Sequence, residues 1–130
     1  MASILKVDTI TGVSTAGSIA VTGEGNSTTT NLQQGLAKAW LRATASAALS
    51  DSLNVSSGTD HGTGDYSFAT TNAFNNINYA NVWTVYTTAG RNAIRNDSRD
   101  ATDTLAVEVN NLSGTNVDHA TNGTSHGDLA

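Results

Sequence analysis

The stretch Thr104-Leu-Ala-Val-Glu-Val-Asn110 has the clearest pattern in this chain. Leu105, Val107 and Val109 alternate with residues that are small or charged, so the apolar side chains share one side of an extended backbone. This period of two predicts a β-strand whose apolar face lies in a core and whose other face points outward. One strand cannot bury that face alone, so other segments must supply partner strands.

Two upstream segments have the same character. Residues Asp65 to Thr70 place Tyr66 and Phe68 on one face, and Tyr79 to Thr88 is the longest strand candidate. The second segment carries apolar side chains on both faces. That pattern is typical of a strand buried on both sides, or buried on one side and docked on a partner with the other.

The remaining segments complete a predicted β-rich body. A strand from Asp51 to Ser57 precedes the glycine-rich turn Ser57 to Gly64. We expect a charged loop over Ala89 to Asp103, and a last edge strand with a free tail within Val117 to Ala130. Short strands separated by regular turns predict a small antiparallel β-sandwich over residues 50–130, so the fold class is mainly β.

A single helix is predicted before this body, from about Asn31 to Ala45, within a segment that spans residues 31–49. Leu32, Leu36 and Trp40 recur at steps of four and form one stripe. A helix of about four turns is stable only when it packs against something. We therefore expect the stripe to be a subunit interface around a threefold axis, which makes the assembly a homotrimer.

Residues 1–30 are predicted to form an extended arm. Ser3 to Ile10 and Ser18 to Thr22 have the character of short strands, which cannot fold alone in water. The polar segment Gly23 to Thr30 then links the arm to the helix. We expect the arm to dock on a partner through its apolar residues, which are Ile4, Leu5, Val7, Ile10, Ile19 and Val21.

Composition limits the classes of function. The chain has 130 residues, no Cys and no Pro, and Thr, Ser, Asn and Gly dominate it, so its apolar core is thin and self-association is expected. A net charge of −5 argues against nucleic acid and anionic membrane surfaces as partners. No apolar run is long enough to cross a bilayer, and Met1 to Ile10 lacks the pattern of a signal peptide.

No motif in the chain predicts catalysis or a cofactor. Asp97, Asp100 and Asp103 recur every three residues, but no EF-hand pattern surrounds them, and we expect a solvated loop. The glycine segments lack the Lys-Ser/Thr pair of a phosphate loop. We therefore predict no enzyme, no cofactor and no metal site. The sequence leaves open whether a histidine binds a metal, the three being His61, His119 and His126.

The aromatic residues of the longest strand candidate allow two interpretations. Tyr79, Trp83 and Tyr86 could stack on sugar rings and serve as a glycan contact. In a chain so poor in bulky residues, a role in the core or in a subunit contact is the favoured interpretation.

Three segments resemble the start of many small virion proteins of marine tailed bacteriophages, which are usually described as tail-fibre or minor structural proteins. These segments are Ser3-Ile-Leu-Lys-Val-Asp-Thr-Ile10, Gly17-Ser-Ile-Ala-Val-Thr-Gly-Glu-Gly25 and Thr30-Asn-Leu-Gln-Gln-Gly-Leu-Ala-Lys38. Scattered similarity follows in Asp51-Ser-Leu-Asn-Val-Ser56, Gly62-Thr-Gly-Asp-Tyr66 and Gly127-Asp-Leu-Ala130. The resemblance implies a trimeric component on the outside of a phage particle, and it carries no catalytic residues.

The leading hypothesis is therefore a tail-fibre-like structural protein at the virion surface. Its arm would bind other virion proteins, and its β-rich body would face the host surface and its glycans. Two alternatives are a capsid decoration, head fibre or connector protein, and a lectin-like glycan-binding module. A hydrolase of host polysaccharide is the weakest alternative, because no paired carboxylates form a recognisable motif.

Overall fold

The computed structural model describes residues 4–12, 19–22, 29–86, 92–96, 98, 100–127 and 129. The chain divides into two compact units, Met1–Leu36 and Ala37–Ala130. Among the described residues, no helix has the length and apolar character needed to cross a membrane.

The first unit has little regular structure. Residues 4–12 are exposed and form neither helix nor strand, so the predicted strand from Ser3 to Ile10 is wrong over its described part. β1 (Ala20–Thr22), inside the second predicted arm strand, pairs antiparallel with β2 (Thr29–Asn31). A single turn of helix, α1 (Leu32–Gly35), follows.

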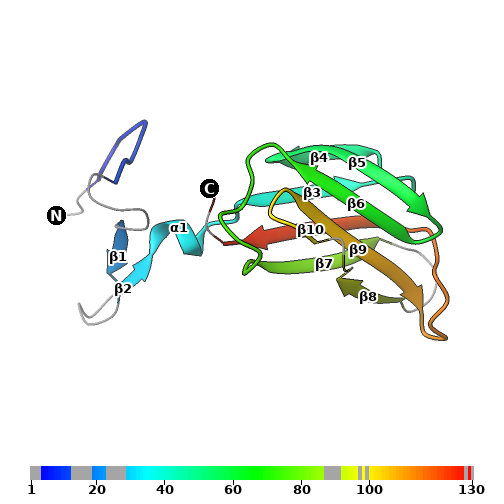
Figure 1. The fold of residues 1–130 in the computed structure, drawn as a ribbon. Coiled ribbons are helices and arrows are strands. Elements are labelled where there is room, and N and C mark those ends of the chain that lie inside the picture. Colours follow the sequence, from blue (N-terminus) through cyan, green and yellow to red (C-terminus); the bar gives the residue numbers. More distant parts are fainter. Residues whose placement is uncertain are drawn as a thin grey trace. The chain divides into compact units, whose positions relative to one another are not determined.

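The second unit contains two four-stranded antiparallel sheets (Figure 1). One has the order β4-β3-β10-β7 and the other the order β5-β6-β9-β8. Their strands are β3 (Ala39–Ala43), β4 (Leu49–Leu53), β5 (Val55–Gly62), β6 (Asp65–Thr70), β7 (Ala80–Tyr86), β8 (Asn92–Asn96), β9 (Thr104–Asn111) and β10 (Ala120–His126). In Figure 1, β6 and β9 cross in front of β3 and β10. The prediction of a mainly β fold with antiparallel strands is confirmed.

The core lies between the two sheets. The burial pattern of β3, from buried to exposed and back, shows the period of two directly, whereas register shifts interrupt the pairing of β3 with β4 and of β5 with β6. Phe68 of β6 and Trp83 of β7 pack across the gap with ring centroids 5.9 Å apart. The largest fully buried apolar side chains are Tyr66, Phe68, Phe74, Leu105, Val107 and Val109. The inward face predicted for β9 is therefore confirmed, although Ala106, predicted to point outward, is also fully buried.

The predicted helix from Asn31 to Ala45 is wrong over most of its length. Only the turn of α1 is helical, and residues Ala39 to Ala43 form β3. The spacing of Leu32, Leu36 and Trp40 fits a helix, but the segment that follows also alternates with a period of two. Burial of Ala39, Leu41 and Ala43 against the other sheet decides between the two patterns.

Three further strand predictions need correction. The predicted strand Asp51–Ser57 is split at Asn54, whose φ of 57° turns the chain from β4 into β5 of the other sheet. The segment predicted as a charged loop contains β8. The last strand, β10, is central and not an edge, because it pairs with both β3 and β7.

Small residues explain how so polar a strand can be central. A Cβ on Gly123 would collide with the ring of Trp83, so the missing side chain lets the indole lie against the backbone of β10. Thr121 and Ser125 flank it on the same inward face and are fully buried. The core beside β10 is therefore filled by the Trp83 side chain of β7, because the inward residues of β10 are small.

Candidate interaction surface

The outer face of the β4-β3-β10-β7 sheet, called here the β3 face, carries two straight rows of side chains. In the first row the register places Leu53, Trp40, Thr124 and Val82 opposite one another across the four strands. In the second row it aligns Asp51, Arg42, Asn122 and Thr84 in the same way. Directly opposed residues of antiparallel strands have neighbouring side chains, so each row is continuous. We call them the apolar row and the polar row.

The apolar row is open to solvent. Leu53 is 48% exposed, Trp40 37% and Val82 58%. Tyr86, two residues after the polar row on β7, is 63% exposed. A sandwich gains nothing from apolar side chains on the side away from its core, so these four residues need another explanation.

The polar row is partly ordered by its neighbours. The guanidinium of Arg42 lies 5.7 Å from the centroid of the Tyr86 ring, within the range of a cation–π contact. The side chain of Asn122 donates a hydrogen bond to the hydroxyl oxygen of Thr84 at 3.4 Å. The first contact places the side chain of Arg42 over the ring of Tyr86. The polar row presents one positive group, Arg42, and one negative group, Asp51.

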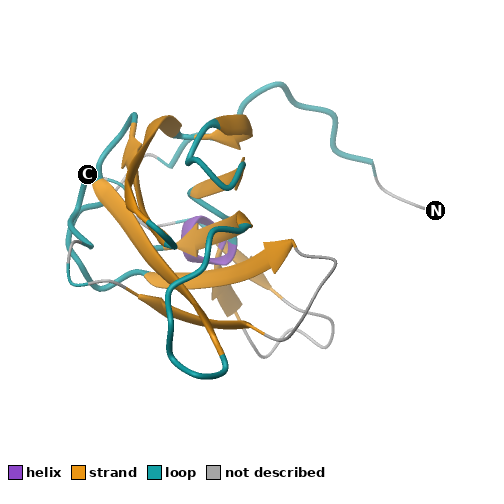
Figure 2. Ribbon diagram, turned by 90° about the vertical axis from the view of Figure 1, so that its right-hand side faces the viewer, coloured by secondary structure: helices purple, strands orange, loops and turns teal. Residues whose placement is uncertain are grey.

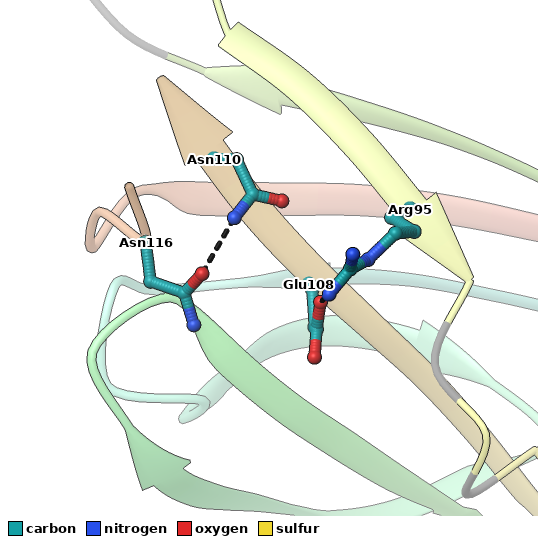
Figure 3. A network of polar contacts seen from close by, with 4 residues as sticks. All are labelled: Arg95, Glu108, Asn110 and Asn116. Carbon is teal, nitrogen blue, oxygen red and sulfur yellow. Dashed lines mark hydrogen bonds and ion pairs between the residues drawn. The ribbon is translucent and has the colours of Figure 1, made fainter. Parts of the chain in front are cut away.

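The outer face of the β5-β6-β9-β8 sheet, called here the β9 face, has a different character. Its outward residues are small, polar or charged, and they include Thr59, Ser67, Ala93, Arg95 and Glu108. Figure 3 shows the ion pair between Arg95 and Glu108 and the nearby bond from Asn110 to Asn116, at 2.5 Å. None of the large apolar residues exposed among the described ones lies on β5, β6, β8 or β9.

The predicted docking residues of the arm are mostly exposed. Ile4, Leu5, Val7 and Ile10 lie in the described segment 4–12, which has no strand partner there. Val21 of β1 is 50% exposed, and Ile19 is half-buried, with its carbonyl accepting a hydrogen bond from the backbone N–H of Leu32. No partner chain is present, so docking by this arm stays a prediction.

The predicted subunit-interface stripe does not form on one helix. Leu32 lies in α1, Leu36 follows that turn, and Trp40 belongs to β3 of the other unit. The structural basis for packing a helix around a threefold axis is therefore absent. Trp40 is nevertheless exposed, on the β3 face.

The three aromatic residues proposed as a glycan contact do not share one surface. Tyr79 and Trp83 pack against the core, Tyr79 stacked on Phe74 with centroids 4.4 Å apart. Tyr86 alone of the three points to solvent. The prediction that this segment carries apolar side chains on both faces is correct, because Trp83 points to the core and Tyr86 to solvent. The aromatic residues that the glycan interpretation groups together therefore lie on opposite faces of the sheet.

Two tyrosines, the buried Tyr66 and the half-buried Tyr79, serve the fold. The Tyr66 hydroxyl donates to the carbonyl of Ala45 at 3.0 Å and lies 3.1 Å from the carboxylate of Asp118, and burial beside that carboxylate raises its pKa. The Tyr79 hydroxyl lies 2.8 Å from the carbonyl of Ala101 and 3.1 Å from that of Thr104. Burial, with the nearby charges of Asp100 and Asp103, raises the Tyr79 pKa to about 12. Because both phenols stay neutral, they donate hydrogen bonds to backbone carbonyls and are poor general bases at neutral pH.

A chain of side chains also links the two sheets. Ser125 donates to Asn81 at 2.5 Å, Asn81 donates to Asp100 at 3.3 Å, and Asp100 accepts the backbone N–H of Ala106 at 2.6 Å. It resembles no nucleophile–base pair, because an amide stands between the hydroxyl and the carboxylate. This series of hydrogen bonds gives a structural role to Asp100, one of the acids of the predicted charged loop. Asp97 lies outside the described residues.

The histidines are spread over the unit. His61 Nε2 bonds the hydroxyl of Ser67 at 2.8 Å, and His119 and His126 are half-buried on other segments. Within the part of the chain that the structure describes, no three His, Asp or Glu side chains gather as metal ligands would. The β3 face is thus the best-defined candidate surface, and the sequence missed it because Leu53, Trp40 and Val82 meet only through the sheet register.

Comparison with known proteins adds no assignment: no family model, no curated protein and no solved structure matches this chain. The function must therefore be argued from the residues and surfaces themselves.

Proposed function

We propose that this chain is a structural protein of a tailed-phage virion, without catalytic activity. Residues 1–30 bind a neighbouring virion protein, and the β unit is displayed at the particle surface for attachment to the host. The proposal is supported by the resemblance of the segments Ser3–Ile10, Gly17–Gly25 and Thr30–Lys38 to phage virion proteins. A tail-fibre-like appendage is the leading form, and a capsid decoration or connector is the alternative.

The exposed arm carries this proposal. Ile4 is 78% exposed, Leu5 80%, Val7 52% and Ile10 57%, all within nine residues of irregular chain. Covering a side chain of this kind contributes on the order of 1.5–3 kcal/mol when burial is complete. A partner groove or sheet edge that covers several of them supplies enough free energy to hold an appendage on a particle.

The number of copies is a separate part of the proposal. A homotrimer is expected from the resemblance, and a thin core favours assembly in general. Since α1 has only one turn, the expected threefold contact would have to come from other residues than a helix stripe.

The arm is tested in particles of the phage that encodes the chain. Antibody against the β unit should label intact particles, and the labelled position, tail or capsid, separates the two forms of the proposal. Replacing Leu5→Asp should remove the protein from purified particles, while the control Thr9→Asp, an equal charge at an exposed polar position, should leave it there. Unlabelled particles that lack the protein would exclude a virion role.

The lectin-like alternative keeps one supporting observation. Tyr86 and Trp40 are exposed on the β3 face beside hydrogen-bonding groups of the polar row. If this face binds glycans, Tyr86→Ala should weaken retention on host-surface polysaccharide, and Trp83→Phe, inside the core, should not. Retention that survives Tyr86→Ala and Trp40→Ala together would remove this alternative.

A further inference from the structure

All four large apolar residues that are exposed in the two four-stranded sheets lie on the β3 face. Trp40 is on β3, Leu53 on β4, and Val82 and Tyr86 on β7. We propose that this face binds the same face of a second copy of the chain, about a twofold axis that runs parallel to the strands between β3 and β10. This contact does not depend on the virion role.

The order of side chains in the rows makes the face self-complementary. A twofold axis between β3 and β10 exchanges β4 with β7 and β3 with β10. It therefore places Leu53 over Val82 of the second copy, and Trp40 over Thr124. Apolar groups meet apolar groups, and the methyl group of Thr124 lies under the indole. The strand axes of the two facing sheets are also aligned, which is the packing that twisted sheets prefer.

Charge supports the same axis. In the polar row it places Arg42 over Asn122 of the second copy and Asp51 over Thr84, so no like charges meet. A twofold axis perpendicular to the strands and midway between the two rows would instead bring Leu53 over Asp51 and Trp40 over Arg42. That arrangement buries each charged group against an apolar one, which is costly. Of these two axes, the one parallel to the strands is favoured by the order of the side chains.

The size of the face sets the expected strength. Four strands about 4.8 Å apart and about six residues long cover on the order of 400 Å² in projection. A stable interface buries about 800 Å² on each partner, so the contact is expected to be weak. The proposal sets its dissociation constant on the order of tens of micromolar, the value that the experiments below test. Copies held together on a particle would form it readily, because their local concentration is high.

Cross-linking of the full chain tests the predicted axis. The chain contains no Cys, so introduced thiols are unique. In the double variant Leu53→Cys/Val82→Cys, each thiol points at the other thiol of the second copy, between sheets whose backbones lie roughly 10 Å apart, the usual separation of packed sheets. A short bismaleimide should then produce a species of twice the chain mass. Within one copy the two positions are three strand spacings apart, about 14 Å, beyond a short reagent.

The controls separate this contact from random association. Either single variant alone should give little dimer, because no thiol faces its own counterpart, and mixing the two single variants should restore it. The matched double variant Thr59→Cys/Ala93→Cys, on the edge strands of the β9 face, should not cross-link.

Three results would overturn the proposal. One is a folded Leu53→Cys/Val82→Cys variant that gives no dimer at about 100 µM, well above the expected dissociation constant. Another is equal cross-linking by the single variants, which would show a different contact. The third is glycan retention that depends on Tyr86 in a protein that stays monomeric, which would assign the face to sugars. Particle labelling, which tests the virion role, is unaffected by any of these outcomes.

Discussion

The two outer faces of the β unit differ although the two inner faces are alike. Both sheets turn bulky residues inward, Leu41 and Trp83 from one and Phe68 and Val107 from the other. Outward, the β9 face shows small and charged groups, and it carries the ion pair between Arg95 and Glu108 and the hydrogen bond from Asn110 to Asn116. The β3 face instead exposes the three large apolar residues of the apolar row, Leu53, Trp40 and Val82 (Figure 2 shows the strands of both sheets from a second side).

This difference teaches which apolar residues serve the fold. Inward residues are fixed by burial, and either sheet would fail without them. The outward row of the β3 face contributes little to that core, so its presence indicates a second task, which we assign to association. The predictions below test this separation, beginning with the largest expected effect.

Truncation inside the core should be severe. Phe68 is fully buried and packs against Trp83, so Phe68→Ala should lower the free energy of unfolding by about 3–5 kcal/mol. The outward aromatic residue Tyr86 provides the comparison, and Tyr86→Ala should cost less than about 1 kcal/mol. Urea denaturation of both variants measures the difference, and equal losses would show that the β3 face is also part of the core.

Adding a methyl group on the inner side of β10 should lower stability, whereas removing a methyl group from its outer side should have little effect. Gly123→Ala forces the Trp83 ring away from β10 and should cost about 1–3 kcal/mol. Thr124→Ala, the next residue, points outward and should change stability by less than about 1 kcal/mol. Thermal unfolding of the two variants checks this, and a tolerated Gly123→Ala would contradict the placement of Trp83.

Alkaline pH should lower stability by ionising Tyr79, whose hydroxyl bonds the carbonyls of Ala101 and Thr104. The Tyr79 pKa is about 12 in the folded chain against 10.0 for an ordinary tyrosine, so folding favours the neutral phenol. Its stabilising contribution is complete below pH 10 and is lost as the pH rises through 12. The free energy of unfolding should fall over that interval, and Tyr79→Phe should reduce the fall. A profile that Tyr79→Phe does not change would place the titrating group elsewhere.

The smallest effect on stability is expected from the apolar row itself. Val82→Thr keeps the shape and the β-propensity of an exposed position, so it should change the free energy of unfolding by no more than about 0.5 kcal/mol. The same change should weaken self-association, since it places a hydroxyl opposite Leu53 of the second copy. Loss of stability without loss of association would reverse the assignment of this row.

The sequence predicts a strand correctly where the apolar residues show a period of two and no competing helical spacing. The bulky apolar residues of β6 and β9 alternate in the sequence and point inward as expected, whereas β7 has apolar residues on both faces, of which Trp83 and Val85 point inward. In β3 the period of two competes with a helical spacing, and only burial against the other sheet resolves it. The polar composition of β10 is compatible with an edge or with a centre, and its place depends on the room that Gly123 leaves for Trp83.

The candidate surface is harder to predict than the fold for a related reason. Trp40 and Leu53 belong to the consecutive strands β3 and β4, Val82 belongs to the more distant β7, and none of them is unusual by itself. They form a row only after the pairing register is known. A single sequence carries no direct signal for that register beyond the alternation within each strand.

The most direct test of the account is the sedimentation velocity of the full chain from about 1 to 200 µM, a range that brackets the expected dissociation constant. The account predicts that the sedimentation coefficient of the wild type rises with concentration. Val82→Lys, in the apolar row, should keep the lowest value throughout, and Thr59→Lys, an equal charge on the β9 face, should follow the wild type. A wild type that stays monomeric at the highest concentration, or two lysine variants that behave alike, would contradict the claim that the β3 face is the interaction surface.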